Sequence, residues 1–117
     1  MTPKKGDPVA PPPGKNEYLI KYDSRAVVDG WRELGNKAPG NTAKAWEAMR
    51  TDPCPHPETE RHHQLKGSLS TQNRDGKDLP QWQIEVTGGG RVWYLLDSKR
   101  RIVWLTKASV GHPSETE

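Results

Sequence analysis

The chain has 117 residues, a net charge of +3 and 31% hydrophobic residues, with no phenylalanine. This length suits one compact domain and is too short for two ordinary ones. A single cysteine, Cys54, excludes an internal disulfide bond, and no apolar run approaches the roughly 20 residues that cross a bilayer. Because the N-terminus also lacks the apolar core of a secretory signal, we expect a cytoplasmic protein without a membrane partner.

The first 17 residues are rich in proline, and Val9 is their only sizeable aliphatic side chain. Such a segment buries too little apolar surface to offset the entropy lost on ordering, so we interpret residues 1–17 as a disordered tail. The folded domain is then expected over residues 18–112, followed by a short C-terminal tail at 113–117.

Two amphipathic helices are predicted after a first strand at residues 18–22. Ser24 is a suitable N-cap for the first helix, whose apolar residues recur at helical spacing and which Gly35 and the Pro39-Gly40 pair should end. Asn41 is a suitable N-cap for the second, over residues 42–50. Because their connection is short, we expect a helical hairpin that covers one face of a sheet.

The second half of the chain predicts antiparallel strands. Trp82, Ile84 and Val86 alternate with polar residues, which is typical of a strand with one buried face. We expect strands at 62–70, 82–86, 91–97 and 102–108, joined by a polar connection at 71–80 and tight turns at 88–90 and 97–101. The predicted fold is an α/β protein of the α+β type: a small, twisted, antiparallel sheet of about four strands with an N-terminal helical hairpin on one face.

This order of elements, with several local strings, resembles the RelE/ParE superfamily of bacterial toxins, and most closely the YoeB-like messenger-RNA interferases. The matching strings lie between residues 18 and 113: Leu65-Lys66, Leu69-Ser70, Trp82, Val86-Thr87, Arg91-Val92, Tyr94, Ala108 and His112. The resemblance implies a microbial-RNase-like fold and a ribosome-dependent endoribonuclease that cleaves bound messenger RNA. It also implies an antitoxin protein as the partner that blocks the toxin.

The resemblance assigns catalytic positions to three residues. Arg91 falls where the family has a phosphate-contacting arginine, and His112 falls on a catalytic histidine near the C-terminus. His63 falls where YoeB-like proteins have a glutamate that acts as general base, and Pro113 stands where a terminal tyrosine is usual. The sequence therefore departs from the family pattern at two positions.

Metal-independent RNA cleavage needs a base at the 2′-hydroxyl, a cation at the phosphate and an acid at the leaving oxygen. A histidine suits either proton transfer because its unperturbed pKa of about 6.5 is close to physiological pH. We therefore predict His63 as base, Arg91 as phosphate stabiliser and His112 as acid, without a cofactor. An ion pair with Glu85 across the hairpin is the alternative for Arg91, and a solvated tail residue is the alternative for His112.

The remaining candidate residues are cations and potential metal ligands. We expect the RNA backbone to be contacted by Lys66, Lys99, Arg100, Arg101 and Lys107. Adjacent His62 and His63 should point to opposite faces of a strand, so at most one of them serves a given site. Cys54 and the nearby histidines lack the paired spacing of zinc ligands, so we predict no metal site.

Two other functions remain open from the sequence. The first is a non-enzymatic inhibitor of DNA gyrase on the same scaffold, as in ParE-like toxins. The second is a degenerate family member that is no longer toxic.

Overall fold

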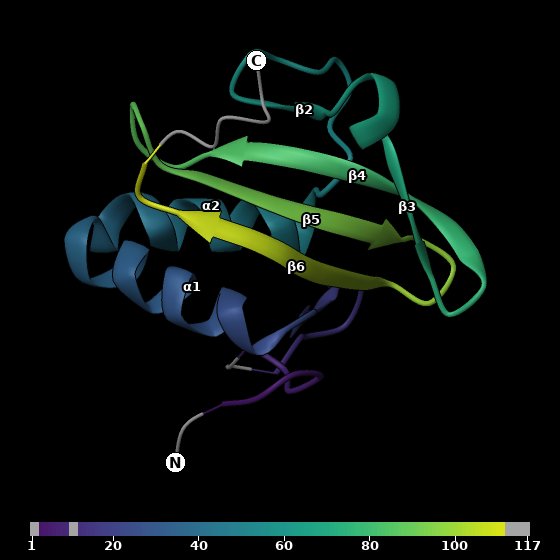
Figure 1. The fold of residues 1–117 in the computed structure, drawn as a ribbon, viewed down its shortest axis with the longest axis horizontal. Coiled ribbons are helices and arrows are strands. Elements are labelled where there is room, and N and C mark those ends of the chain that lie inside the picture. Colours follow the sequence, from purple (N-terminus) through teal and green to yellow (C-terminus); the bar gives the residue numbers. More distant parts are fainter. Residues whose placement is uncertain (1–2, 10–11, 112–117) are drawn as a thin grey trace.

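The protein consists of two helices packed on one face of a mixed β-sheet (Figure 1). A computed structural model describes residues 3–9 and 12–111. In chain order the elements are β1 (Leu19–Tyr22), α1 (Arg25–Lys37), α2 (Pro39–Thr51), β2 (His62–Gln64), the short 3₁₀ helix η1 (Gly67–Leu69), β3 (Thr71–Arg74), β4 (Lys77–Glu85), β5 (Arg91–Asp97) and β6 (Ile102–Ser109).

The sheet has the order β1-β6-β5-β4-β2, and β3 pairs with the first half of β4. All neighbouring strands are antiparallel except β1, which runs parallel to β6. Parallel strands need a crossover connection, and the connection between β1 and β6 includes the helical hairpin. The first strand therefore lies beside the last one, and the helices cover the sheet between them.

The expected helical hairpin is present, with different boundaries. Helix α1 continues past Gly35 to Lys37, and α2 begins at Pro39, where a proline is well accommodated because that position needs no amide donor. Asn41 therefore lies inside α2 and is not its cap. Close packing of α1 on β6 depends on Gly30, because a Cβ there would lie 2.0 Å from the Ala108 carbonyl oxygen.

The prediction of about four strands was wrong, because the sheet has six. The expected polar connection at residues 71–80 forms β3 and the start of β4. Asp75 and Gly76 both have positive φ, the geometry of a tight hairpin turn for which the Asp-Gly pair is the usual signal. The expected strand at 62–70 is correspondingly shorter, since only residues 62–64 are extended before η1.

Part of the N-terminal segment pairs with the sheet, unlike the expected disordered tail. The Gly6 amide donates to the Tyr22 carbonyl at 2.8 Å, and the Val9 amide donates to the Ile20 carbonyl at 2.7 Å. Val9 is 5% exposed and joins the core. These bonds occupy the free edge of β1, which would otherwise present unpaired backbone groups.

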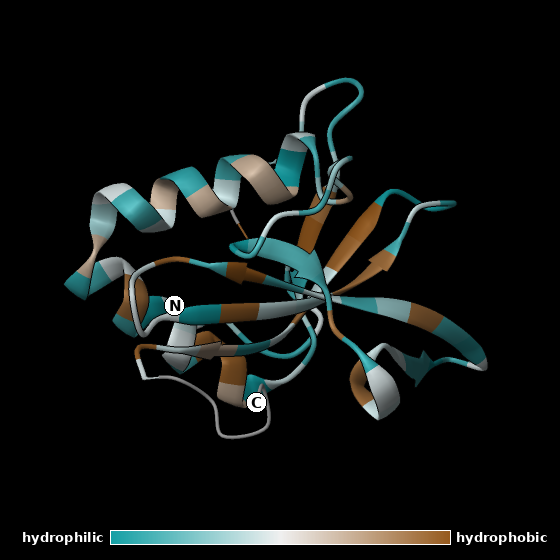
Figure 2. Cartoon of the chain, turned by 90° about the horizontal axis from the view of Figure 1, so that it is seen from above, coloured by the Kyte–Doolittle hydropathy of each residue, from teal (hydrophilic) through white to brown (hydrophobic). Residues whose placement is uncertain are grey.

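The two faces of the sheet differ in what covers them. The helix face carries the main core, in which Tyr94, Val92 and Leu105 are fully buried. Hydrophobic positions gather on the strands, whereas the connecting loops are mostly hydrophilic (Figure 2). Trp93 and Leu95 are also buried, but they point to the opposite face and are not part of the main core. None of the described helices is long and apolar enough to cross a membrane.

Candidate nucleic-acid interface

Four residues on neighbouring strands form a row across the face of the sheet that lies opposite the helices. His63 of β2 is paired with Gln83 of β4, Gln83 with Trp93 of β5, and Trp93 with Lys107 of β6. Directly paired residues project to the same face, so the four side chains are neighbours. We call His63, Gln83, Trp93 and Lys107 the cross-strand row.

Contacts within the cross-strand row hold its centre in one conformation. The Trp93 indole N–H donates to Gln83 Oε1 at 2.8 Å. The Lys107 ammonium nitrogen lies 4.5 Å from the centre of the Trp93 ring, a cation–π distance. Trp93 is 4% exposed, so its ring is held by the surrounding residues. The ring contacts the Gln83 amide and the Lys107 ammonium.

His63 lies at the β2 end of the row beside an open pocket of ≈ 340 Å³, which Glu58, Glu60 and Lys66 also line. Its Nδ1 is 3.2 Å from the Thr59 carbonyl oxygen, which can only accept, so Nδ1 carries the proton in this contact. In the neutral ring the other nitrogen, Nε2, then has a free lone pair. The imidazole is therefore arranged to accept a proton through Nε2.

A second pocket, of ≈ 290 Å³, lies beside the other end of the row and is lined by Trp93, Thr106, Lys107 and residues of η1 and β3. Gln81 within it is buried and fully engaged: its amide donates to the Leu69 carbonyl at 2.9 Å and accepts from Thr106 Oγ1 at 3.0 Å. The cross-strand row is thus flanked by two hollows.

Aromatic and cationic side chains continue along this face to its far edge. Trp104 of β6 is paired with Lys21 and with Leu95, so it projects to the same side as the cross-strand row. The Arg74 guanidinium carbon lies 3.5 Å from the centre of the Trp104 ring, and the Lys21 ammonium lies 5.0 Å from it. Arg74 also forms an ion pair with Asp23, which fixes the position of its guanidinium.

Arg91, the predicted phosphate stabiliser, is buried against the turn between β4 and β5. Its Nη1 donates to the carbonyls of Thr87, Gly88 and Gly90 at 3.1–3.2 Å. Its Nη2 is 3.3 Å from Glu85 Oε2, which is the ion pair that the sequence left open as an alternative. With 8% of the residue exposed, Arg91 directs its donors to the protein itself.

The structure does not bring His63 and Arg91, two of the predicted catalytic residues, together. His63 and Arg91 lie on the same face, but they are two strands apart and offset by two residues, which separates their Cα atoms by about 12 Å in a regular sheet. His112 lies outside the described residues. The catalytic roles of these three residues stay predictions.

The five predicted RNA-binding cations fall into two groups. Lys66 and Lys107 border the hollows beside the cross-strand row. Lys99, Arg100 and Arg101 lie in the turn between β5 and β6, at the opposite end of the strands from Arg91. Arg101 is turned toward the β1 edge, because its guanidinium lies over Tyr18 and donates to the Asn16 carbonyl.

His62 points to the helix face, as the prediction of opposite directions for the adjacent histidines required. Its Nε2 lies 2.5 Å from the Tyr94 hydroxyl, which donates its own proton to the Pro53 carbonyl at 2.6 Å. The hydroxyl must therefore accept from His62, so Nε2 carries a proton. Burial lowers the pKa of His62 to about 4, which keeps the imidazole neutral at physiological pH.

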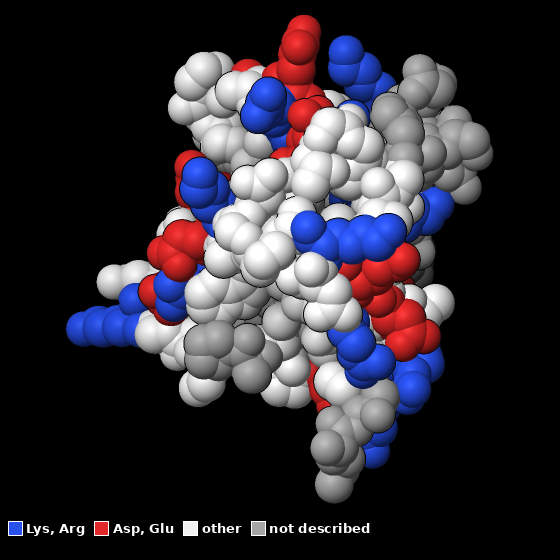
Figure 3. All heavy atoms as spheres, turned by 90° about the vertical axis from the view of Figure 1, so that its left-hand side faces the viewer, with Lys and Arg blue, Asp and Glu red and all other residues white. Residues whose placement is uncertain are grey.

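Charge does not single out the end of the molecule that Figure 3 shows. At the end of the molecule that carries the turn between β4 and β5, basic and acidic side chains are interspersed around uncharged ones (Figure 3). Among the described residues, no group of three or more His, Cys, Asp or Glu side chains is arranged to hold a metal ion.

No model of a protein family matches the sequence, and no curated protein is significantly similar to it. The functional assignment is therefore argued from the residues of the sheet.

Proposed function

We propose that this protein is the toxin of a type II toxin-antitoxin system, an endoribonuclease that cleaves messenger RNA on the ribosome. The observation that carries the proposal is the cross-strand row, which places an imidazole and a cation on one face of the sheet between two hollows. Single-stranded RNA is bound in part through contacts of cations with phosphates, and Lys66 and Lys107 border the two hollows of this face.

The chemistry proposed for this face is attack of a ribose 2′-hydroxyl on the adjacent phosphate. His63 Nε2 removes the 2′-hydroxyl proton, the 2′-oxygen forms a bond to phosphorus, and the bond from phosphorus to the 5′-oxygen breaks. A proton delivered to the 5′-oxygen completes the step, with His112 as its predicted donor. Lys66, which lines the same pocket as His63, is proposed to offset the charge that develops on the phosphate. Lys107, three strand spacings from His63, is proposed to contact a different phosphate of the same RNA.

The proposed partners are messenger RNA in the ribosome and an antitoxin protein that covers the same face. The proposal locates the protein in the cytoplasm, where both are found. The helical hairpin packs on one face of the sheet, so the opposite face, with the cross-strand row, is the one proposed to meet these partners.

A specific observation favours one rival, the non-enzymatic gyrase inhibitor. Arg91 is engaged by Glu85 and by three carbonyls, so a phosphate would have to displace these partners before reaching the guanidinium. A binder that lacks catalysis needs no free arginine at this position. The two functions differ in which nucleic acid is damaged in the cell.

Induced expression followed by primer extension on a reporter message tests the proposal. The parent protein should produce cuts in phase with codons, and His63→Gln should reduce cleavage by about 100-fold, as expected for loss of a general base. Lys37→Gln, which removes an exposed cation at the end of α1, is the matched control and should cut like the parent. An intact message together with damaged DNA would replace the nuclease with the gyrase inhibitor.

A further inference from the structure

A third pocket lies on the other side of β2, between α2 and the end of β4, and has a volume of ≈ 270 Å³. Its floor is apolar and includes Ile84 and Val86, which belong to the helix face of β4. His62, which points away from His63, is part of its wall. The pocket is therefore separate from the cross-strand row.

The rim of this pocket carries excess positive charge. Lys44 of α2 is exposed and, within the described part of the chain, has no ion-pair partner. Arg61 has a side chain that is 83% exposed, and its Nε lies 3.8 Å from Glu85 Oε1. Glu85 is already held at 3.3 Å by the buried Arg91, so the pocket is lined by two cations, Lys44 and Arg61, and by one carboxylate that is paired with a third.

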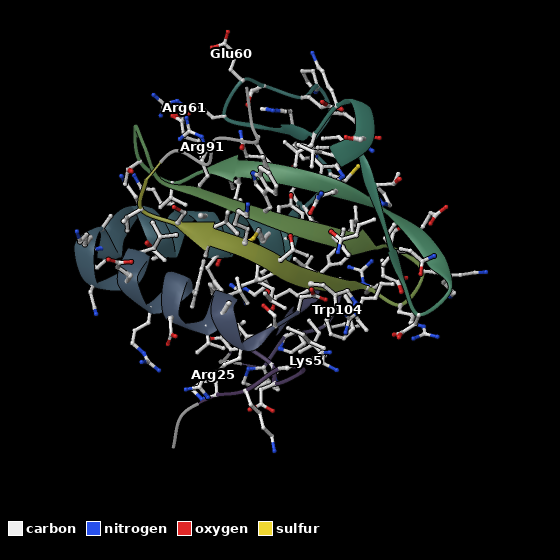
Figure 4. All side chains as sticks on the ribbon, viewed as in Figure 1. Lys5, Arg25, Glu60, Arg61, Arg91 and Trp104 are labelled. Atoms are coloured by element: carbon white, nitrogen blue, oxygen red, sulfur yellow. The ribbon has the colours of Figure 1, made fainter. Side chains whose placement is uncertain are left out.

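The labelled side chains in Figure 4 show how these groups are arranged. Arg61 and Arg91 lie next to each other at the end of the sheet, whereas the neighbouring Glu60 extends away from them. The nearest acidic residue in sequence to Arg61 therefore does not cover its guanidinium. The rim is accessible to a negatively charged group.

The inner wall of the pocket offers hydrogen-bond acceptors. Because His62 donates through Nε2 to the Tyr94 hydroxyl, its Nδ1 carries no proton and can only accept. Glu85 is a carboxylate that also borders the pocket. A bare anion would be repelled by these two groups. A ligand that joins an anionic group to an amino group matches both the rim and the wall.

We propose that this pocket binds a nucleoside monophosphate unit whose base carries an exocyclic amino group. The phosphate lies between Lys44 and Arg61, the face of the base rests on Ile84 and Val86, and the amino group donates to His62 Nδ1 or Glu85. Cytosine has an amino group at the position where uracil and thymine have a carbonyl oxygen. The pocket should therefore distinguish CMP from UMP.

Isothermal titration calorimetry with the full-length chain tests the inference. CMP should bind, and UMP and inorganic phosphate should each bind at least about tenfold more weakly, a difference of about 1.4 kcal/mol. Arg61→Gln and Lys44→Gln should each weaken CMP binding by about tenfold, whereas Lys99→Gln, an exposed cation far from the pocket, should leave it unchanged. Circular dichroism and thermal melting of each variant verify that it is folded.

Three results would overturn the inference: no binding of CMP, equal binding of CMP, UMP and phosphate, or an equal loss in Lys99→Gln. A short RNA that ends in a cytidine 3′-phosphate identifies the source of the ligand, because its competition with CMP indicates an RNA end and its failure to compete indicates a free nucleotide. The test does not depend on the proposed nuclease. His63→Gln should reduce cleavage by about 100-fold and leave CMP binding intact.

Discussion

Replacing Arg91 by alanine should destabilise the protein, because the structure assigns the guanidinium to the turn between β4 and β5. The substitution removes the Nη1 donor from three carbonyls and leaves Glu85 with only the exposed Arg61. Loss of one partner from a buried ion pair costs about 3–5 kcal/mol. The Glu85 side chain is 20% exposed and water relieves part of this cost, so we expect the lower end, about 3 kcal/mol.

Urea denaturation followed by tryptophan fluorescence measures this loss of unfolding free energy. In a thermal melt the same loss should lower Tm by about 12 °C in a domain of this size. Lys99→Ala, which removes an exposed cation from the turn at the other end of β5, should change the unfolding free energy by less than about 0.5 kcal/mol. A double-mutant cycle with Glu85→Gln should reveal coupling between the two charges. An Arg91→Ala protein as stable as the parent but unable to cleave RNA would refute the structural role and support the catalytic one.

Two further predictions concern the helix face. The pKa of His62 is about 4 in the folded protein and about 6.5 when unfolded, so the unfolded state binds more protons between these values and stability should fall as the pH drops from 6.5 to 4. The full shift corresponds to about 3 kcal/mol, and because the ring is partly exposed we expect about 1–2 kcal/mol, measured by urea denaturation at both pH values and reduced in His62→Gln. Gly30→Ala should cost at least about 2 kcal/mol because its Cβ would meet the Ala108 carbonyl oxygen, whereas Gly35→Ala, with open space around it, should stabilise by about 0.5–1 kcal/mol in thermal melts.

Sequence patterns predicted the elements whose signal is local. The helical spacing of Val27 and Leu34 identified α1, and the alternation of Trp82 with Ile84 identified the second half of β4. The opposite directions of His62 and His63 follow from the period of a strand and hold in the structure. These features depend on backbone geometry over a few residues, which the sequence specifies well.

The missed elements depend on contacts between residues that are distant in sequence, or on a sequence signal of only two residues. Strand β3 is polar and exposed, so its hydrophobic pattern is weak, and the Asp75-Gly76 pair was the only clear sign of its hairpin. Val9 is buried because it reaches the edge of β1, a contact that proline content alone does not reveal. The strand count was therefore too low because β3 was missed, and the pairing of the N-terminal segment with the edge of β1 was missed separately.

The position of Arg91 shows why residue type did not determine its role. A guanidinium suits a carboxylate and a phosphate equally well, since both present two oxygens to its fork of donors. What separates the two roles is the glycine-rich turn, which curls its carbonyls around Nη1 while Glu85 occupies Nη2. Lys107 also lies on the open face, over Trp93 and beside a hollow. A phosphate that contacts the cross-strand row therefore need not displace Glu85 from Arg91, and for this reason we propose the row, and not Arg91, as the site of RNA contact.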